Sequence, residues 1–225
     1  MSVSVYLAQA LEVRQSAAAS SALLRGLFIL VNRVAAGVLL VALSPLMLVV
    51  AWLVWRQDRG PLLFGHFRVG LDGCLFRCLK FRTMRLNAAE MLAELLRNDP
   101  AARAEWERDH KLSNDPRVTG IGDFLRRTSL DELPQLFNVL RGEMVLVGPR
   151  PITVEELTKY GRTRWHYLAV PPGITGLWQV SGRSDTTYDE RVALDRQYVE
   201  TRSPWVDLCV LLKTVKVVLL RDGAR

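Results

Sequence analysis

Two adjacent acids, Asp131 and Glu132, are the side chains of this sequence best suited to chemistry. They lie in the stretch RRTSLDELPQL, behind two arginines and ahead of an apolar run. An ionised carboxylate can attack an electrophile, handle a proton or bind a hard cation such as Mg²⁺. Arginines close to such a pair would favour an anionic substrate, above all one that carries phosphate.

The same pair also fits a purely structural role at the start of a helix. With Ser129 as N-cap, Glu132 becomes the third helical residue and completes a capping box. If the helix begins later, Pro134 becomes its first residue, a position that proline prefers. In both registers the free N–H groups of the first turn favour a carboxylate or a bound phosphate. Most acids at helix starts only cap the helix, so the spacing alone leaves both interpretations open.

Four basic residues become relevant only if the fold gathers them around the acids. They are Lys80, Arg126, Arg150 and Arg183. Arg150 lies between two prolines in a rigid turn, and each of the four would otherwise be an ordinary surface charge. Trp178, in the loop that precedes Arg183, is expected to serve packing.

Composition limits the choice of partners. The chain has 225 residues and a net charge of +7, which favours nucleic acid, a phospholipid surface or a phosphorylated substrate. The three cysteines and three histidines match neither a disulfide framework nor a zinc site, so we expect reduced thiols and exclude a histidine-based zinc enzyme.

One segment, residues 34–55, is uncharged and long enough to span a bilayer, which takes roughly 20 residues. Ser44-Pro45 in its middle predicts a kink or a break, because proline lacks the N–H and its ring clashes with the preceding turn. Arginines on both sides favour keeping both ends in the cytoplasm. These are Arg25, Arg33, Arg56 and Arg59. A kinked spanning helix and a re-entrant helix therefore both remain open.

The rest of the chain predicts helices and one hairpin. Apolar runs on both sides of Gly70-Leu71-Asp72-Gly73 predict a β-hairpin. Capping pairs predict helices over about 87–97 and 187–200, and weaker signals predict helices from 100, over 129–141 and over 154–160. The last segment, from Trp205, holds Lys213 and Lys216, which favour an interfacial or core helix over a spanning one.

Four motifs taken together resemble one family. The runs KFRTM, SLDELPQLFNVLRGEM, VGPRP and PGITGLWQVSGR, in this order, resemble the bacterial sugar transferases, which are monotopic polyprenyl-phosphate phosphoglycosyl transferases. The similarity extends from about Leu27 to the C-terminus and includes the Ser-Pro of the apolar segment. The stretch SGRSDTTYDERVALDRQYV is most similar to the exopolysaccharide enzymes that move galactose-1-phosphate or glucose-1-phosphate.

The resemblance implies a reaction and roles for the residues above. A UDP-hexose would give its hexose-1-phosphate to undecaprenyl phosphate and release UMP, through a covalent phosphosugar-enzyme. Asp131 would be the nucleophile, and Glu132 its partner in a dyad that binds Mg²⁺ or handles a proton. The four basic residues Lys80, Arg126, Arg150 and Arg183 would contact phosphates or the nucleotide.

The resemblance also implies an α+β fold that is mostly helical. Residues 1–24 would be flexible, residues 25–58 a re-entrant membrane helix broken at Ser44 and Pro45, and residues 59–225 a catalytic domain with a hairpin and an interfacial C-terminal helix. This domain would face the cytoplasm at the bacterial inner membrane, contact lipids, allow a homodimer and bind no nucleic acid. Two other functions remain open, a basic membrane-anchored binding module without catalysis and a different phosphotransfer enzyme.

Overall fold

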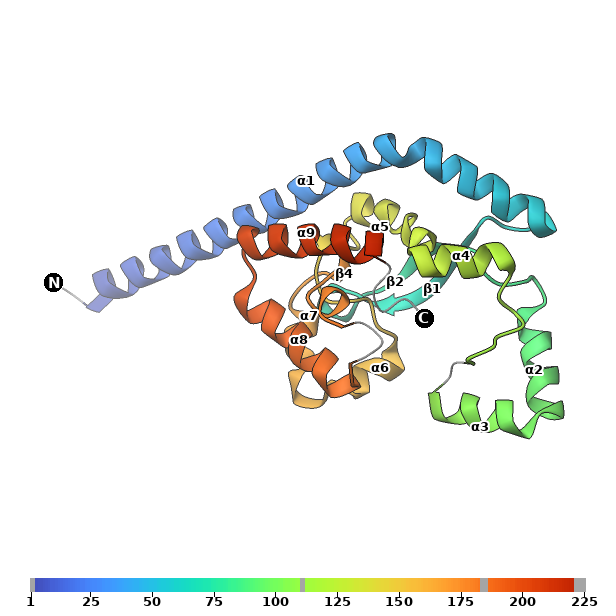
Figure 1. The fold of residues 1–225 in the computed structure, drawn as a ribbon. Coiled ribbons are helices and arrows are strands. Elements are labelled where there is room, and N and C mark those ends of the chain that lie inside the picture. The colour runs from blue at the N-terminus through green and yellow to red at the C-terminus, as the bar shows by residue number, and fades with distance from the viewer. Residues whose placement is uncertain (1–2, 110–111, 183–185, 221–225) are drawn as a thin grey trace.

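The structure is a computed structural model that describes residues 3–109, 112–182 and 186–220 (Figure 1). Within these ranges it is mostly helical, as the sequence predicts, with two small sheets, of which the sequence predicts one. The α-helices are α1 Val3–Asp58, α2 Ala88–Asn98, α3 Pro100–Asp109, α4 Gly120–Thr128, α5 Gln135–Arg141, α6 Val154–Thr158, α7 Arg164–Leu168, α8 Tyr188–Thr201 and α9 Pro204–Leu220. Short 3-10 turns are η1 Leu71–Gly73, η2 Leu130–Glu132, η3 Gly161–Thr163 and η4 Trp178–Val180.

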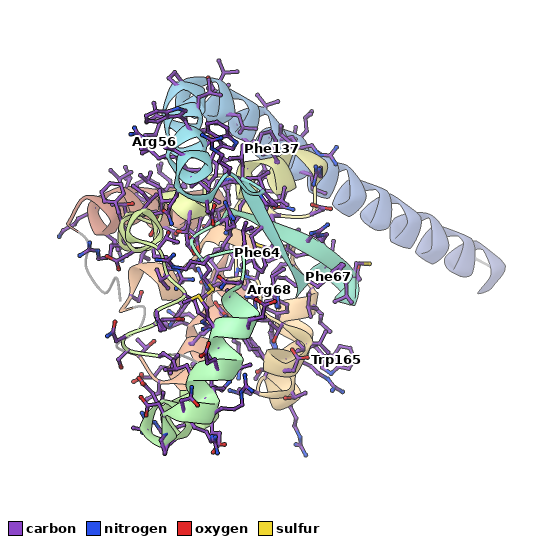
Figure 2. The ribbon with its side chains drawn as sticks, turned by 90° about the vertical axis from the view of Figure 1, so that its right-hand side faces the viewer. Arg56, Phe64, Phe67, Arg68, Phe137 and Trp165 are labelled. Carbon is purple, nitrogen blue, oxygen red and sulfur yellow. The ribbon has the colours of Figure 1, made fainter. Side chains whose placement is uncertain are left out.

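The predicted hairpin is present. Strands β1 Leu63–Val69 and β2 Leu75–Phe81 pair antiparallel, and the pairs His66–Cys78 and Phe64–Lys80 lie directly opposite each other. Two left-handed residues close the turn, Asp72 with φ 54° and Gly73 with φ 81°, in agreement with the turn chemistry of the sequence. One face of the hairpin packs on the domain, where Phe76 and Cys78 are buried, while Phe67 of β1 is exposed (Figure 2).

The second sheet joins distant parts of the chain. Strand β3 Val145–Val147 runs parallel to β4 Gly173–Thr175, and the connection between them contains α6, η3 and α7. Parallel neighbours need such a crossover because a tight turn can only reverse the chain. The sheet therefore brings the loop after β3 close to the loop after β4.

Helix α1 lies across the domain over its second half (Figure 1). Its part from Gly26 to Asp58 is apolar and long enough to cross a membrane, by length and composition. Ahead of Pro45, Ala36 packs into a core cluster with α5 and β2. After Pro45, Val50 and Val54 pack into a second cluster with α4. The other side of the helix is an exposed apolar surface that includes Val34, Val38, Val41, Leu48, Val49, Trp52 and Trp55.

Polar contacts fix both ends of this apolar part to the domain. At the first end, the Asn32 Oδ1 accepts a hydrogen bond of 2.8 Å from the Leu146 N–H. The neighbouring Arg33 donates to the carbonyl of Arg141 at 3.0 Å. At the other end, Asp58 forms a two-pronged ion pair with Arg82, which follows β2.

Pro45 does not end the helix. Helix α1 continues through it and changes direction as it crosses the domain (Figure 1). Proline leaves the carbonyl four residues earlier, that of Val41, without its helical donor. The Ser44 hydroxyl donates to this same carbonyl at 2.8 Å, so the Ser-Pro pair replaces the missing hydrogen bond. Of the kink or break predicted at Ser44-Pro45, the kink is therefore present and the break is not, since the chain bends there within one helix.

The segment around the acids differs from the simplest prediction. Ser129 adopts a left-handed conformation with φ 57°, ends α4 and makes no capping hydrogen bond. The predicted capping box from Ser129 to Glu132 is therefore wrong. Helix α5 instead begins after Pro134, the later of the two predicted starts, and ends at Gly142 with φ 81°. The two acids lie in the separate turn η2.

Of the other predicted helix caps, one is present and one is not. Thr187 and Glu190 form the predicted capping box at α8. Helix α2 begins where predicted, but the Asn87 side chain makes no capping hydrogen bond. In α9, Val210 is buried against the domain, while a row of apolar side chains is exposed on the same helix. This row comprises Trp205, Leu208, Leu212 and Val215.

Candidate active site

A cleft of about 1010 Å³ opens between helix α1, the hairpin, η2 and the loops after β3 and β4. Its lining is of two kinds. Apolar side chains from α1, from η2 and from the residue that follows η2 include Leu39, Leu43, Leu130 and Leu133. Charged side chains include Arg68, Lys80, Arg126, Asp131, Glu132, Arg150, Glu156 and Arg191. Such a cleft can receive a molecule that is partly lipid and partly highly charged.

Asp131 and Glu132 lie in this cleft with two cations on them. The Lys80 Nζ is 2.7 Å from Glu132 Oε1 and 3.4 Å from Asp131 Oδ2. The Arg150 Nη2 is 3.0 Å from the same Glu132 oxygen. The structure thus brings together four of the predicted site residues, from β2, η2 and the loop after β3.

The surroundings of the two acids shift their pKa values in opposite directions. Burial raises the pKa of Asp131 above its ordinary value, and the Lys80 charge offsets this only in part. Burial also acts on Glu132, but the charges of Arg150 and Lys80 outweigh it and lower the pKa of Glu132 to about 2. Glu132 is therefore a fixed anion that holds two cations. Among the described residues, Asp131 makes only the longer Lys80 contact, which leaves its carboxylate available for reaction.

Local structure explains these positions. Leu130 and Leu133, on both sides of the acids, pack into the cluster below α1 and hold η2 in place. The buried Asn138 of α5 bonds to the backbone of β2 on both sides of Cys78, at 3.0 Å to the Leu79 N–H and 2.8 Å to the Arg77 carbonyl. Strand β2 then extends Lys80 over the acids.

Arg150 is presented by the loop after β3. Gly148 and Gly173 approach so closely that a Cβ on either would overlap the backbone of the other. A Cβ on Gly176 would overlap the Gly148 carbonyl. The motifs VGPRP and PGITG are therefore two sides of one contact, and the rigid proline turn beyond it points Arg150 at Glu132.

The remaining predicted residues lie apart from the acids. Arg126 lines the cleft and donates from Nε to the Thr83 hydroxyl at 3.0 Å, with no contact to either acid. Arg183 lies outside the described residues. Ser44 and Pro45 lie within α1, as described above. The roles of these residues in catalysis or binding stay predictions.

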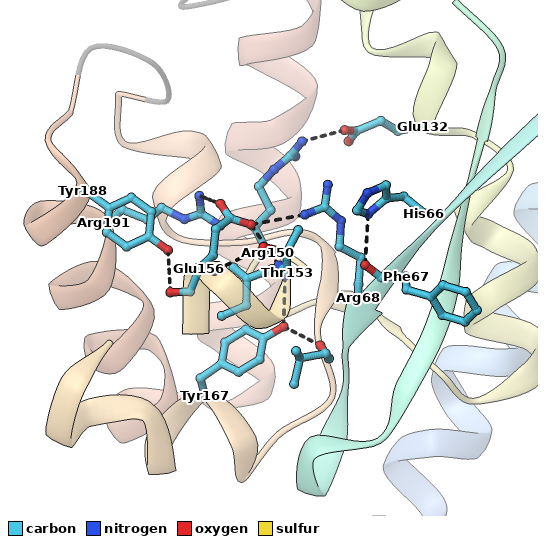
Figure 3. A network of polar contacts seen from close by, with 12 residues as sticks. His66, Phe67, Arg68, Glu132, Arg150, Thr153, Glu156, Tyr167, Tyr188 and Arg191 are labelled. Carbon is cyan, nitrogen blue, oxygen red and sulfur yellow. Dashed lines mark hydrogen bonds and ion pairs between the residues drawn. The ribbon is translucent and has the colours of Figure 1, made fainter. Parts of the chain in front are cut away.

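A charged network on the cleft wall was not predicted (Figure 3). Glu156 binds Arg68 at 3.1 Å through one carboxylate oxygen and Arg191 at 3.3 Å through the other. The Arg191 guanidinium lies 4.5 Å from the ring of Trp178, and that of Arg150 lies 6.0 Å from the same ring. The expectation that Trp178 only packs is incomplete, because it also holds two cations. The T-x-x-E spacing of Thr153 and Glu156 could have revealed the helix cap, but not these arginines.

Asp131 and Glu132 would suit a magnesium ion whose remaining ligands come from substrate and water. Among the described residues, no three His, Cys, Asp or Glu side chains gather at one place. Mg²⁺ commonly takes only one or two carboxylates and completes its shell with substrate phosphates and water. Asp131 and Glu132 would hold it, and it would neutralise charge on a bound diphosphate.

Comparisons with known proteins point to one family. A family model described as "Bacterial sugar transferase" matches residues 26–221. An "Undecaprenyl-phosphate galactose phosphotransferase" of Salmonella typhimurium is 58% identical over 186 residues, covering 83% of this chain and 39% of that protein. The "Exopolysaccharide production protein ExoY" of Rhizobium meliloti is 50% identical over 190 residues, covering 84% of both chains. A "UDP-glucose:undecaprenyl-phosphate glucose-1-phosphate transferase" of Caulobacter vibrioides is 40% identical over 199 residues, covering 85% of this chain and 69% of that protein. The chain thus spans about two fifths of the Salmonella relative.

Proposed function

Because the chain belongs to the bacterial sugar transferase family, we propose that it transfers hexose-1-phosphate from a UDP-hexose to undecaprenyl phosphate and releases UMP. The hexose is galactose or glucose, and the product starts an exopolysaccharide. The observation that carries the proposal is the pair of buried Asp131 and partly buried Glu132 under Lys80 and Arg150, in a cleft that also has an apolar lining.

The reaction proceeds in two displacements at one phosphorus. A carboxylate oxygen of Asp131 bonds to the phosphorus that bears the hexose, the bond from that phosphorus to the UMP oxygen breaks, and UMP leaves with the electron pair. An oxygen of undecaprenyl phosphate then attacks the same phosphorus and displaces the Asp131 carboxylate. The lipid leaves with the hexose phosphate, and the enzyme is restored.

The charges around the acids suit this sequence of steps. A carboxylate and a diphosphate repel each other, and Lys80 and Arg150 reduce that repulsion from positions held by Glu132. Mg²⁺ bound by Asp131 and Glu132 would supply further positive charge to the diphosphate. The burial of Asp131 limits the water that could hydrolyse the acyl phosphate.

The lipid substrate requires that the site meet a bilayer. We assign α1 to a re-entrant path in the bacterial inner membrane, with the domain on the cytoplasmic face and α9 at the lipid interface. Leu39 and Leu43 of α1 line the cleft, so a polyprenyl chain beside α1 would lie next to the acids. The exposed apolar sides of α1 and α9 would contact lipid.

The reaction is tested by UMP release in detergent, from a panel of UDP-hexoses with Mg²⁺, with and without undecaprenyl phosphate. We expect lipid-dependent release with one donor and its loss in Asp131→Asn, by roughly a thousandfold or more, because an amide is a poor nucleophile. The matched control is Asp123→Asn, since Asp123 is 54% exposed and its one ion pair among the described residues is with Arg127 on the surface of α4.

A basic membrane-anchored binding module makes different predictions. Binding would depend on many lysines and arginines, fall steeply with salt and be unaffected by Asp131→Asn. A folded preparation that releases no UMP with any donor would reject the proposed reaction and favour this alternative. Release of another nucleotide would instead indicate a different phosphotransfer enzyme.

A further inference from the structure

His66 faces the cleft from the same side of the hairpin as Lys80. Side chains two residues apart on a strand share a face, and so do residues directly opposite on its partner. His66 pairs with Cys78, and its neighbour Phe64 pairs with Lys80. All four side chains line the cleft, and His66 itself is exposed. Figure 3 shows His66 and Phe67 pointing in different directions from β1.

This placement puts His66 within reach of a sugar bound at the acids. Two residues that are diagonal neighbours across a hairpin lie about 7–8 Å apart, measured between their backbones. Lys80, the diagonal neighbour of His66, contacts both Asp131 and Glu132. A hexose is of comparable size, so a hexose whose phosphate lies at Lys80 extends as far as His66.

The hydrogen bond of the histidine ring defines its chemistry. The His66 Nδ1 lies 3.0 Å from the Phe67 carbonyl oxygen. A carbonyl carries no proton, so Nδ1 must be the donor, and Nε2 of the neutral ring is left as an acceptor. The backbone bond thus selects the tautomer that offers an acceptor.

Two of the carboxylates that line the cleft already bind cations. Glu132 is engaged by Lys80 and Arg150, and Glu156 by Arg68 and Arg191. These cations can donate hydrogen bonds to phosphate but cannot accept a hydrogen bond from a hydroxyl. Phe64, whose ring centre is 6.3 Å from that of His66, adds an exposed aromatic surface beside the acceptor. Together they offer a hydrogen-bond acceptor and an apolar surface, which suits the hydroxyls and C–H groups of a sugar.

We propose that His66 is a specificity-determining residue, and that its Nε2 accepts a hydrogen bond from one hydroxyl of the donor hexose. The inference rests on the proposed function, because it assumes a hexose-1-phosphate at Lys80. Phe64 packs beside that sugar, and the cations hold the diphosphate.

The test compares kcat/KM for the preferred UDP-hexose and its 2-, 3-, 4- and 6-deoxy analogues, measured as UMP release by the full chain. His66→Leu removes the acceptor, whereas His66→Gln offers an amide oxygen at a similar distance. We expect His66→Leu to lower kcat/KM for the full hexose about fivefold to tenfold, as for the loss of one neutral hydrogen bond. For the one analogue that lacks the contacted hydroxyl, His66→Leu should leave kcat/KM almost unchanged. His66→Gln should restore most of the efficiency.

Phe67→Leu is the matched control, since Phe67 is 61% exposed on the other face of the same strand. It should leave the pattern across the analogues unchanged. An equal effect of His66→Leu on every analogue, or no effect on any, would overturn the proposal. A changed inhibition constant for UMP would assign His66 to the nucleotide and overturn it too. Absence of UMP release by the wild type concerns the proposed function instead, and it would appear before any variant is compared.

Discussion

Asp131 and Glu132 are adjacent acids with different surroundings. Glu132 receives both Lys80 and Arg150 on one oxygen, so its charge serves to hold these cations in place. Asp131 is the more weakly paired, and burial raises its pKa. A nucleophile needs an unoccupied carboxylate and a positioning anion needs tight partners. These surroundings fit the roles proposed for the two acids, a nucleophile in Asp131 and a positioning anion in Glu132.

Lys80 should set the pH at which the nucleophile becomes active. Its charge lowers the pKa of Asp131, against the upward effect of burial. Activity requires the ionised form and is lost as pH falls through that pKa. Replacing Lys80 raises the pKa, so the acid limb of the kcat/KM profile should move to higher pH in Lys80→Met. The rate at its plateau should also fall roughly a hundredfold, as for one lost cationic contact to the transition state.

The pH profile of UMP release measures both effects. Lys159→Met serves as control, because Lys159 lies over the ring of Tyr188 and is not among the residues that line the cleft. An acid limb that stays in place, or moves to lower pH, would show that Lys80 does not control the ionisation of Asp131.

At the scale of residues, the sequence predicts which side chains belong to the candidate site better than it predicts which of them pair. The motifs identify the acids, Lys80 and Arg150 by resemblance. They do not identify Glu156 as the partner of Arg68 and Arg191, which lie 88 and 35 positions away in the chain. No periodic pattern encodes such distances, because they depend on how the crossover between β3 and β4 returns the chain.

At the scale of elements, the contact between the loops after β3 and β4 decides where Arg150 lies. Parallel pairing of two three-residue strands supplies few hydrogen bonds. The two loops are also held together by close backbone contact at Gly148, Gly173 and Gly176. This contact requires that no side chain stand between the loops. The glycines of both motifs thus determine where the Arg150 side chain lies.

Gly176→Ala tests this role. The added Cβ would overlap the Gly148 carbonyl, so the two loops must separate and Arg150 must move from Glu132. We expect kcat/KM for UMP release to fall roughly a hundredfold, together with a lower midpoint of thermal unfolding in detergent. Gly120→Ala is the control, since a Cβ there meets nothing within 4 Å. Equal activity of the two variants would show that the loop contact does not position the site.

Element boundaries follow local chemistry where that chemistry is unopposed. The hairpin turn and the Thr187–Glu190 box are present as predicted because nothing competes with them. Ser129 satisfies the pattern of a capping box equally well, yet it ends the preceding helix in a left-handed turn. Packing of Leu130 and Leu133 under α1 decides that conformation, and the sequence around Ser129 carries no sign of it.

At the scale of the molecule, the position of α1 limits how the protein can meet a membrane. From Arg33 to Asp58 a helix measures roughly 37 Å at 1.5 Å per residue, more than the roughly 30 Å of a bilayer core. A straight spanning helix would therefore place these residues on opposite faces. Both are bonded to the same globular domain, Arg33 to the Arg141 carbonyl and Asp58 to Arg82. A helix that enters and leaves one leaflet satisfies both contacts.

Cysteine labelling in intact cells or sealed inverted vesicles tests this topology. In a chain with Cys74, Cys78 and Cys209 replaced by serine, single cysteines are introduced as Ser20→Cys and Gln57→Cys. Gln57 is exposed near the end of α1. A re-entrant helix predicts that a membrane-impermeant maleimide labels both cysteines in inverted vesicles and neither in intact cells. Labelling of the two from opposite faces would establish a spanning helix, and the domain contacts of Arg33 and Asp58 could then not both persist in the membrane. The result thus decides between two topologies that the apolar segment, the Ser-Pro pair and the flanking arginines leave open.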